Sequence, residues 1–163
     1  GAGTLWDTFS GTLLQTYVMR SDARHVALTA DGNRLAIGDW ADNIKVLDTS
    51  TGSVLQSFRG YIAYSDAVPL SMDGTLLALG TVSNAPGIHG INLWDVSTGV
   101  LLRTLMIPGH DELHSVALSG NGRLVAAGLS KNGAHHTAQL WDTASGALLH
   151  TLNGHAHRLV AMA

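Results

Sequence analysis

The sequence predicts an all-β fold made of four-stranded antiparallel sheets that are repeated along the chain. The composition favours turns and apolar strands over long solvated helices, because 19 of the 163 residues are glycine and only 13% are charged. A segment that ends in an apolar residue, Trp and Asp recurs at a nearly constant spacing. A second segment, with a central Asp-Gly or Asn-Gly, lies between successive copies. Self-similarity at a period of 40 to 50 residues is typical of an array of identical supersecondary units.

The Trp-Asp segments predict one hairpin in each repeat. Their anchor positions are separated by 41, 47 and 47 residues and are Trp6, Leu47, Trp94 and Trp141. The aspartates that follow these anchors are Asp7, Asp48, Asp95 and Asp142. Each aspartate precedes a Ser/Thr-Gly turn and then an apolar run. A tight glycine turn between two strand-forming runs is typical of a β-hairpin.

The Asp-Gly segments predict the other hairpin. They begin at His25, Ala67 and Ser115, and each has a glycine in its central turn, where a positive φ is required. Two hairpins in each period give four antiparallel strands, which we name a to d from the Asp-Gly hairpin onward. Pro69 falls in strand a, and proline is tolerated in a sheet only where its missing N–H is not needed. Strand a is therefore expected at an edge of its sheet.

The strand count leaves both ends of the chain incomplete. The predicted units are strands c and d of an incomplete sheet at 1–19, three complete repeats at 20–60, 61–108 and 109–154, and the start of a further unit at 155–163. The incomplete ends lack a b strand, so they cannot complete one sheet together. We expect a fragment of a larger protein whose open sheet edges favour self-association or binding of another chain that forms such sheets.

These residues resemble the WD-repeat β-propeller family. The resemblance rests on the Trp-Asp pairs at 6–7, 94–95 and 141–142 and on the Gly-His pairs at 109–110 and 154–155. It implies propeller blades of four antiparallel strands, with strand a lining a central channel. It also implies structural roles for the repeat anchors, which are Trp6, Asp7, Asp48, Trp94, Asp95, His110, Trp141, Asp142 and His155.

The chain departs from the family pattern in its second unit. Leu47 stands in place of the tryptophan, and Gly60-Tyr61 stands in place of Gly-His. Strand b has no hydroxyl at the usual place, so the hydrogen-bond network that stabilises blades of the family is expected to be incomplete.

Charge and residue types exclude several classes of function. Nine Lys and Arg against twelve Asp and Glu give a net charge of −3, which does not provide the basic surface of a nucleic-acid-binding protein. The chain has no cysteine, and hence no disulfide, thiolate metal site or thiol nucleophile. It has no apolar run of transmembrane length and no signal-peptide pattern. We expect a soluble chain with no membrane partner, with the cytoplasm as the favoured compartment.

One end of the sheets carries the candidate contact residues. The a–b and c–d turns are short and alike, whereas the b–c loops at the opposite end are long and irregular, and loops on a rigid scaffold concentrate binding residues. The candidates for partner contact are Trp40, Tyr61, Tyr64, His89, Lys131, His135 and His136. For Trp40, packing beneath its own loop is the competing interpretation.

Eight of the nine histidines fall in or beside these loops, and most are interpreted as solvated side chains. A metal site formed by His89, His135 and His136 is a minor hypothesis, because adjacent loop histidines impose no metal geometry. We expect no metal and no cofactor.

The sequence contains no catalytic motif, and strand a offers only His25, Asp66 and His114 near its start. We therefore expect a non-catalytic protein-interaction scaffold. The alternative is a propeller enzyme, or a module that binds a metal or small ligand through the histidine-bearing loop face.

Overall fold

The computed structural model describes residues 2–19, 21–60, 68–81, 89–107, 109, 112–131 and 133–159, and the regular elements in these residues are β-strands. The first sheet pairs β1 (Ala2–Trp6) with β2 (Leu13–Val18). The second sheet contains, in order, β3 (Ala23–Leu28), β4 (Arg34–Asp39), β5 (Asn43–Asp48) and β6 (Val54–Arg59). The third contains β7 (Leu76–Gly80), β8 (His89–Asp95) and β9 (Leu101–Ile107). The fourth contains β10 (Glu112–Leu118), β11 (Leu124–Lys131), β12 (Ala134–Asp142) and β13 (Leu148–His155).

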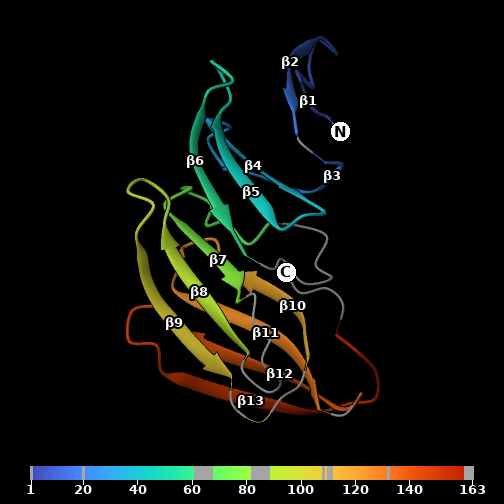
Figure 1. The fold of residues 1–163 in the computed structure, drawn as a ribbon, viewed down its shortest axis with the longest axis vertical. Coiled ribbons are helices and arrows are strands. Elements are labelled where there is room, and N and C mark those ends of the chain that lie inside the picture. The colour runs from blue at the N-terminus through green and yellow to red at the C-terminus, as the bar shows by residue number, and fades with distance from the viewer. Residues whose placement is uncertain are drawn as a thin grey trace.

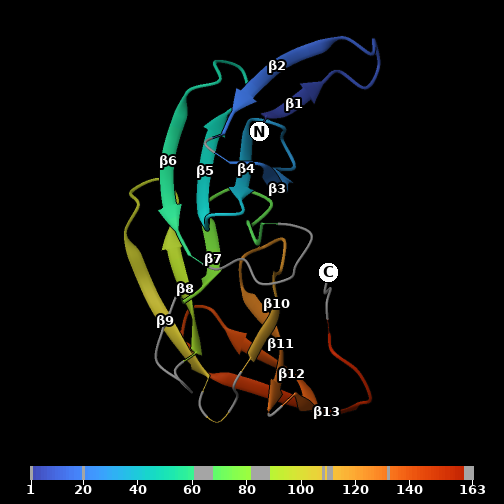
Figure 2. The same cartoon turned by 45° about the vertical axis from the view of Figure 1, so that its right-hand side comes forward.

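The four sheets follow one another in chain order as an open series of propeller-like blades (Figure 1). The first sheet lies at the top of the view and the fourth at the bottom, and the turned view in Figure 2 shows the same succession. All strand pairs are antiparallel, and each sheet is a meander in which chain neighbours pair. The predicted all-β fold class is confirmed.

Strand a is at the edge of its sheet, as the proline indicated. Both β3 and β10 are edge strands. In the third sheet this position is represented by a single bridge between Leu70 and Leu77. There the Pro69 carbonyl accepts a hydrogen bond from the Ala78 amide at 2.9 Å, so proline serves as an acceptor where it cannot donate.

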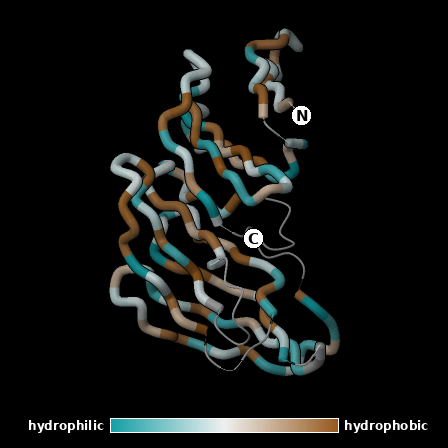
Figure 3. Tube along the Cα trace, in the orientation of Figure 1, coloured by the Kyte–Doolittle hydropathy of each residue, from teal (hydrophilic) through white to brown (hydrophobic). Residues whose placement is uncertain are grey.

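The core consists of three apolar clusters, one between each pair of neighbouring sheets. Tyr17 and Met19 pack on Leu35, Ile37 and Leu47 between the first two sheets. The cluster between the second and third sheets comprises Ala36, Ile44, Val46, Phe58, Val68, Leu77, Leu79 and Val96. The cluster between the third and fourth comprises Ala78, Ile91, Leu93, Leu105, Ile107, Leu113, Val116, Val125, Ala127, Leu129 and Trp141. Figure 3 shows the corresponding hydrophobic stretches along the strands. Burial between sheets is the main source of stability in this arrangement.

Polar contacts also link successive sheets. The Ala30 amide donates to the Met72 carbonyl at 2.9 Å, and the Met72 amide donates to the Gly120 carbonyl at 2.8 Å. These three residues belong to the a–b turns of the second, third and fourth sheets. Backbone hydrogen bonds therefore link the three a–b turns, and they hold this end of the sheets at a fixed spacing.

Glycine is required in the c–d turns for two reasons. Gly99 has a φ of +70°, and a Cβ there would lie 2.9 Å from the side-chain nitrogen of Gln56 in the preceding sheet. Gly146 has a φ of +74°, and a Cβ there would lie 2.7 Å from the side chain of Arg103 in the preceding sheet. Each turn thus receives a long polar side chain from the strand d before it. A larger residue would be strained in its backbone and would displace that side chain.

The aspartates after the anchors fold the c–d turns. The Asp48 carboxylate accepts hydrogen bonds from the Thr51 amide at 2.8 Å and from the Ser50 hydroxyl at 2.7 Å. Hydrogen bonds to the charged form favour ionisation, and those from Ser50 and Thr51 lower the pKa of Asp48 to about 2. Asp95 receives the same bonds from Ser97 and Thr98, and its pKa is also about 2. These carboxylates act as turn caps.

The anchor tryptophans differ in their surroundings. Trp141 is 3% exposed between the third and fourth sheets, and Leu47 fills the equivalent position of the second sheet at 3%. Trp94 is half-buried, its ring centroid lies 5.7 Å from that of Phe58, and its buried indole nitrogen has no hydrogen-bond partner among the described residues. Trp6 is 54% exposed, because no sheet precedes β1 and β2 in the described residues.

Candidate functional site

The candidate site is the end of the sheets at which strand a begins and strand b ends, which we call the loop end. At this end β3 meets the last residues of β4, and β10 meets the last residues of β11. Both strand pairs contain a register shift. Ala23 pairs with Asp39 and His25 with Gly38, which leaves Arg24 as an extra residue. In the fourth sheet Leu113 pairs with Leu129 and Ser115 with Gly128, which leaves His114.

These two bulges are equivalent in register. The residue after Asp39 is Trp40, and the residue after Leu129 is Ser130. The pair formed by Arg24 and Trp40 therefore stands in the second sheet where His114 and Ser130 stand in the fourth. A β-bulge takes one residue out of the alternation of faces and redirects its side chain, and bulges are frequent near functional sites.

In the second sheet the bulge produces an exposed pair. The guanidinium carbon of Arg24 lies 3.9 Å from the centroid of the Trp40 ring, and Trp40 is 62% exposed. This distance is within the range of a cation–π interaction. The preceding residue, Asp39, is 4% exposed and accepts hydrogen bonds from the Ala41 and Asn43 amides at 2.9 and 3.0 Å. Asp39 thus fixes the turn on which Trp40 is displayed.

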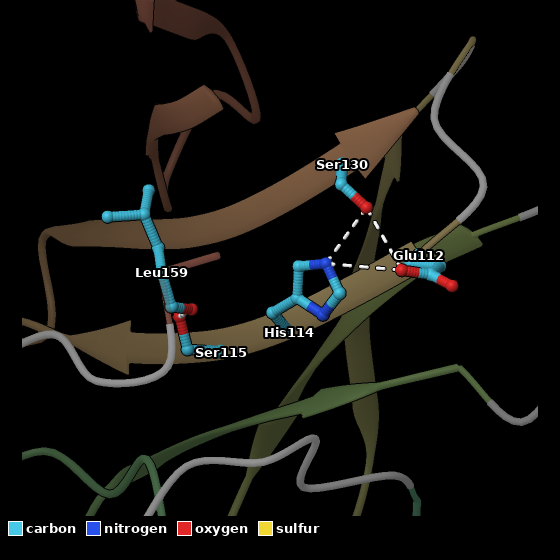
Figure 4. Close-up of polar contacts among 5 residues, drawn as sticks. All are labelled: Glu112, His114, Ser115, Ser130 and Leu159. Carbon is cyan, nitrogen blue, oxygen red and sulfur yellow. Dashed lines mark hydrogen bonds and ion pairs between the residues drawn. The ribbon is translucent and has the colours of Figure 1, made fainter. Parts of the chain in front are cut away.

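In the fourth sheet the bulge produces a buried cluster (Figure 4). The Nε2 atom of His114 lies 2.9 Å from the Ser130 hydroxyl and 3.3 Å from a carboxylate oxygen of Glu112. Ser130 in turn donates to that Glu112 oxygen at 3.0 Å. His114 is 1% exposed and Ser130 is fully buried, whereas the Glu112 side chain is about half exposed.

The geometry of this cluster differs from that of a serine nucleophile with its base. In a serine nucleophile the serine and the acid lie at opposite nitrogens of the histidine. Here Ser130 and Glu112 both lie at Nε2 of His114, and the Ser130 hydroxyl is placed to donate to Glu112. Burial lowers the pKa of His114, Arg158 lowers it further, and Glu112 opposes them. The cluster joins the start of β10 to the end of β11 with a neutral imidazole.

The other predicted contact residues of the fourth sheet lie around this cluster. Lys131 ends β11 and is exposed, and His135 is exposed with a φ of +52°. His136 is half-buried, pairs with His155 across β12 and β13, and has its ring centroid 6.3 Å from that of His114. The structure thus brings Lys131, His135, His136 and His155 to one corner of the loop end.

Several predicted residues are not placed. Tyr61, Tyr64 and His110 lie outside the described residues, and for His89 the structure gives only its backbone position at the start of β8. The structure therefore does not test the hypothetical metal set of His89, His135 and His136, which stays a hypothesis. Among the described residues no group of three or more His, Asp or Glu side chains is arranged to hold a metal ion.

Two histidines differ from the sequence interpretation. His25 and His114 were interpreted as loop-side, solvated residues, but they are 4% and 1% exposed. Both lie near the start of strand a, as the sequence indicates, but their side chains are buried. Arg24, Glu112 and Ser130 were not singled out at all. Their positions in the predicted strands could have identified them, because all three lie within two residues of a strand end on the side of the long b–c loops.

Comparisons with known proteins agree with the fold and leave the family open. No protein-family model matches the chain. The chain is 25% identical over 134 residues to autophagy-related protein 16 of Arabidopsis thaliana, a match that covers 80% of this chain and 25% of that protein. This chain therefore spans about a quarter of the length of the curated relative.

A solved structure has the same fold. Hydrazine synthase of Kuenenia stuttgartiensis superposes with a TM-score of 0.71 over 93% of this chain and 43% of that chain, at 18% sequence identity. At this identity the similarity shows the fold alone. The described residues contain no helix that is long and apolar enough to span a membrane.

Proposed function

We propose that this chain is a non-catalytic protein-interaction scaffold built of WD-like repeats, and that it acts as part of a longer protein. The Trp-Asp and Asp-Gly segments, the open series of propeller-like sheets and the match to autophagy-related protein 16 support this proposal. The chain spans only 25% of that relative and 43% of the similar structure, which supports its being one part of a larger molecule.

The observation that carries the proposal is the exposed Arg24–Trp40 pair. Tryptophan and arginine are the residues most enriched among interface hot spots. Trp40 exposes 62% of its surface although the interior has room for tryptophan, as Trp141 shows at 3%. The bulge at Arg24 and the Asp39 cap hold the pair in one geometry. A rigid, exposed pair loses little conformational entropy on binding, which favours affinity for a protein surface.

The chemistry of the loop end supports a non-catalytic role. Its best-placed hydroxyl, that of Ser130, shares the Nε2 side of His114 with Glu112, so the acid does not hold the imidazole from the opposite nitrogen. The enzyme and metal-binding alternatives would require a base aimed at a nucleophile or a convergent set of ligands. No arrangement among the described residues favours either of them, so we do not develop them into a second function.

Site-specific photo-crosslinking tests the proposal. A photoreactive phenylalanine replaces Trp40, and a matched probe replaces Ser50, an exposed residue of a c–d turn at the opposite end of the second sheet. In cells that express the chain, we expect the probe at 40 to capture a defined protein and the probe at 50 to capture none. That protein, once purified, should bind the wild-type chain and lose affinity for the Trp40→Ala variant. Equal labelling from both positions would contradict a contact role for the loop end.

A further inference from the structure

One contact between neighbouring sheets differs from the others. We call the contact between a sheet and the next sheet a joint. In each joint, two residues of strand d, separated by one residue, point to the same side of their sheet and toward the next sheet. These pairs are Gln15 and Tyr17 in the first joint, Gln56 and Phe58 in the second, and Arg103 and Leu105 in the third. They are equivalent in register, because each pair lies at the same distance along strand d from the residue opposite the anchor.

The third joint departs from the other two at both positions. In the first two joints one of the two residues is aromatic, and the Phe58 ring lies 5.7 Å from the ring of the anchor Trp94. Leu105 takes this place in the third joint, in the same apolar cluster as the anchor Trp141. At the other position the first two joints have an uncharged glutamine, whereas Arg103 carries a positive charge. The joint in which leucine stands in place of an aromatic residue is therefore also the joint with a cation.

A hollow of about 450 Å³ lies beside this leucine. Its inner wall includes Leu105, Trp141 and Gln139, which are 2%, 3% and 9% exposed, and its rim includes the exposed residues Arg103 and Leu148. A cavity of about 150 Å³ is enough to hold a benzene ring, so this hollow has room for an aromatic side chain and part of the backbone that carries it. The hollow lies between the third and fourth sheets, so it does not depend on where the sequence begins or ends.

Arg103 provides a positioned cation at the rim of the hollow. One of its guanidinium nitrogens donates to the Ala144 carbonyl at 2.9 Å, and its Cδ atom lies against Gly146, where a Cβ would be 2.7 Å away. The guanidinium is thus held at the c–d turn of the fourth sheet. This hydrogen bond leaves other N–H donors of the guanidinium available, and no carboxylate of the described residues forms an ion pair with it. Arginine favours bidentate contact with a carboxylate, so the rim fits an acidic side chain.

The strand beside the hollow can pair with an extended segment of another protein. β9 is an edge strand of the third sheet, since it pairs with β8 on one side only. An edge strand presents main-chain N–H and C=O groups that another chain can use. A residue of the added segment that lies opposite Leu105 points to the same side of the sheet, and hence into the hollow. The residue two positions further along the segment then lies opposite Arg103.

We propose that the hollow binds an aromatic side chain of a partner protein, carried by an extended segment that pairs with β9 and places a carboxylate on Arg103. The ring packs on Trp141 and Leu105, as the Phe58 ring packs on Trp94 in the second joint. Antiparallel pairing, which joins all the strands of these sheets, gives the order aromatic residue, any residue, acidic residue along the partner. This surface is separate from the loop end, so the proposal goes beyond the proposed function and does not rest on it.

Binding of a synthetic peptide tests the chemistry of the site. The probe is the fluorescein-labelled peptide Ser-Thr-Val-Thr-Phe-Thr-Glu-Thr-Val-Ser, and fluorescence anisotropy is measured as the full chain is added up to about 1 mM. We expect a dissociation constant of about 100 μM or lower. A peptide with alanine in place of phenylalanine should bind about tenfold more weakly or worse, since the ring fills the hollow. A peptide with glutamine in place of glutamate should bind about threefold more weakly or worse, since it lacks the carboxylate.

Two variants of the chain locate the peptide. Leu105→Phe places a ring in the hollow and should raise the dissociation constant about tenfold or more. Leu55→Phe is its matched control, because Leu55 is 45% exposed on strand d of another sheet, and it should bind as the wild type does. Arg103→Gln introduces the residue that the second joint has at this position, and it should weaken binding of the glutamate peptide but not of the glutamine peptide. Arg103 is exposed, so this second variant decides the matter if circular dichroism shows that Leu105→Phe has lost its β-structure.

The same titration separates this site from the loop end. Trp40→Ala should bind the peptide with wild-type affinity, and a loss of affinity in that variant would place the peptide at the loop end and overturn the proposal. The proposal is also overturned if the wild-type chain does not bind the peptide at about 1 mM, or if a folded Leu105→Phe variant binds it as tightly as the wild type. None of these results changes the outcome expected for crosslinking at position 40.

Discussion

The Arg24 guanidinium lies 3.9 Å from the centre of the Trp40 ring, and these two residues are equivalent in register to His114 and Ser130, which are hydrogen-bonded in the fourth sheet. The same backbone device, a bulge at the start of strand a, thus supports an exposed cationic and aromatic pair in one sheet and a buried polar cluster in another. Substitutions in the exposed pair and in the buried cluster should therefore have different effects on the stability of the fold.

Coupling between Arg24 and Trp40 should be measurable but small. A double-mutant cycle with Arg24→Ala and Trp40→Ala should give a coupling free energy of about 0.5 to 1 kcal/mol, as for exposed cation–π pairs. Urea unfolding of the four proteins provides the measurement. Arg24→Lys should retain part of the coupling. Strictly additive single effects would show that the two side chains do not interact in solution.

The two tryptophans should differ strongly in their contribution to stability. Trp141→Ala removes a side chain that is 3% exposed, and it should lower the free energy of unfolding by about 3 to 5 kcal/mol. Trp40→Ala removes a mostly exposed ring and should cost about 1 kcal/mol or less. Chemical denaturation of both variants checks this. Similar losses for the two substitutions would place Trp40 in the core instead of at the surface.

His114 should make the stability of the fold depend on pH. Burial lowers its pKa in the folded chain, with Arg158 and His136 acting in the same direction and Glu112 against them. The unfolded chain should therefore bind the proton first, so this contribution to stability is complete above about pH 6.5 and is lost as the pH falls through the lowered pKa.

The His114→Gln variant tests this directly, since glutamine can donate to Ser130 but does not titrate. The loss of stability of the wild-type chain below about pH 6.5 should be reduced in this variant. His150→Gln is the control, because His150 is exposed on β13, and it should keep the wild-type profile. A His114→Gln profile parallel to that of the wild type would mean that another group is responsible.

An aromatic ring at position 105 should stabilise the joint between the third and fourth sheets. A hollow of about 450 Å³ lies there, lined by Arg103, Thr104, Leu105, Met106, Gln139, Trp141, Gly146 and Leu148. At the equivalent place between the second and third sheets, Phe58 packs on Trp94 at 5.7 Å. Leu105→Phe should raise the free energy of unfolding by about 0.5 to 1.5 kcal/mol through a ring contact with Trp141. Leu149→Phe, on exposed β13, should have little effect, and destabilisation by Leu105→Phe would indicate a tightly filled joint.

The repeats made the sheets predictable from sequence. The turn glycines, the Trp-Asp segments and Pro69 predict the antiparallel order of the strands and the edge position of strand a, because each acts through the local backbone. The solvent exposure of the anchor residues was harder to predict from the sequence. Trp6 and Trp141 occur in nearly identical segments, and only the presence or absence of a preceding sheet distinguishes 54% from 3% exposure.

The site was harder to predict because it depends on register. A bulge shifts the strand pairing by one residue, and no sequence pattern around Arg24 or His114 predicts that shift. The sequence therefore identified Trp40 as a candidate without its cationic partner. It also placed His114 among solvated loop residues, since alternation of faces cannot be followed through an extra residue.

The bulges have a consequence for how such a chain can change over time. Residues in regular alternation serve the joints between sheets, so a substitution there alters packing on both sides. Arg24 stands outside that alternation and is exposed, so a substitution there alters what the loop end displays without repacking the joints. Affinity for a partner and packing between the sheets can then be varied separately, which makes this exposed bulge position the natural place to diversify a library built on this chain.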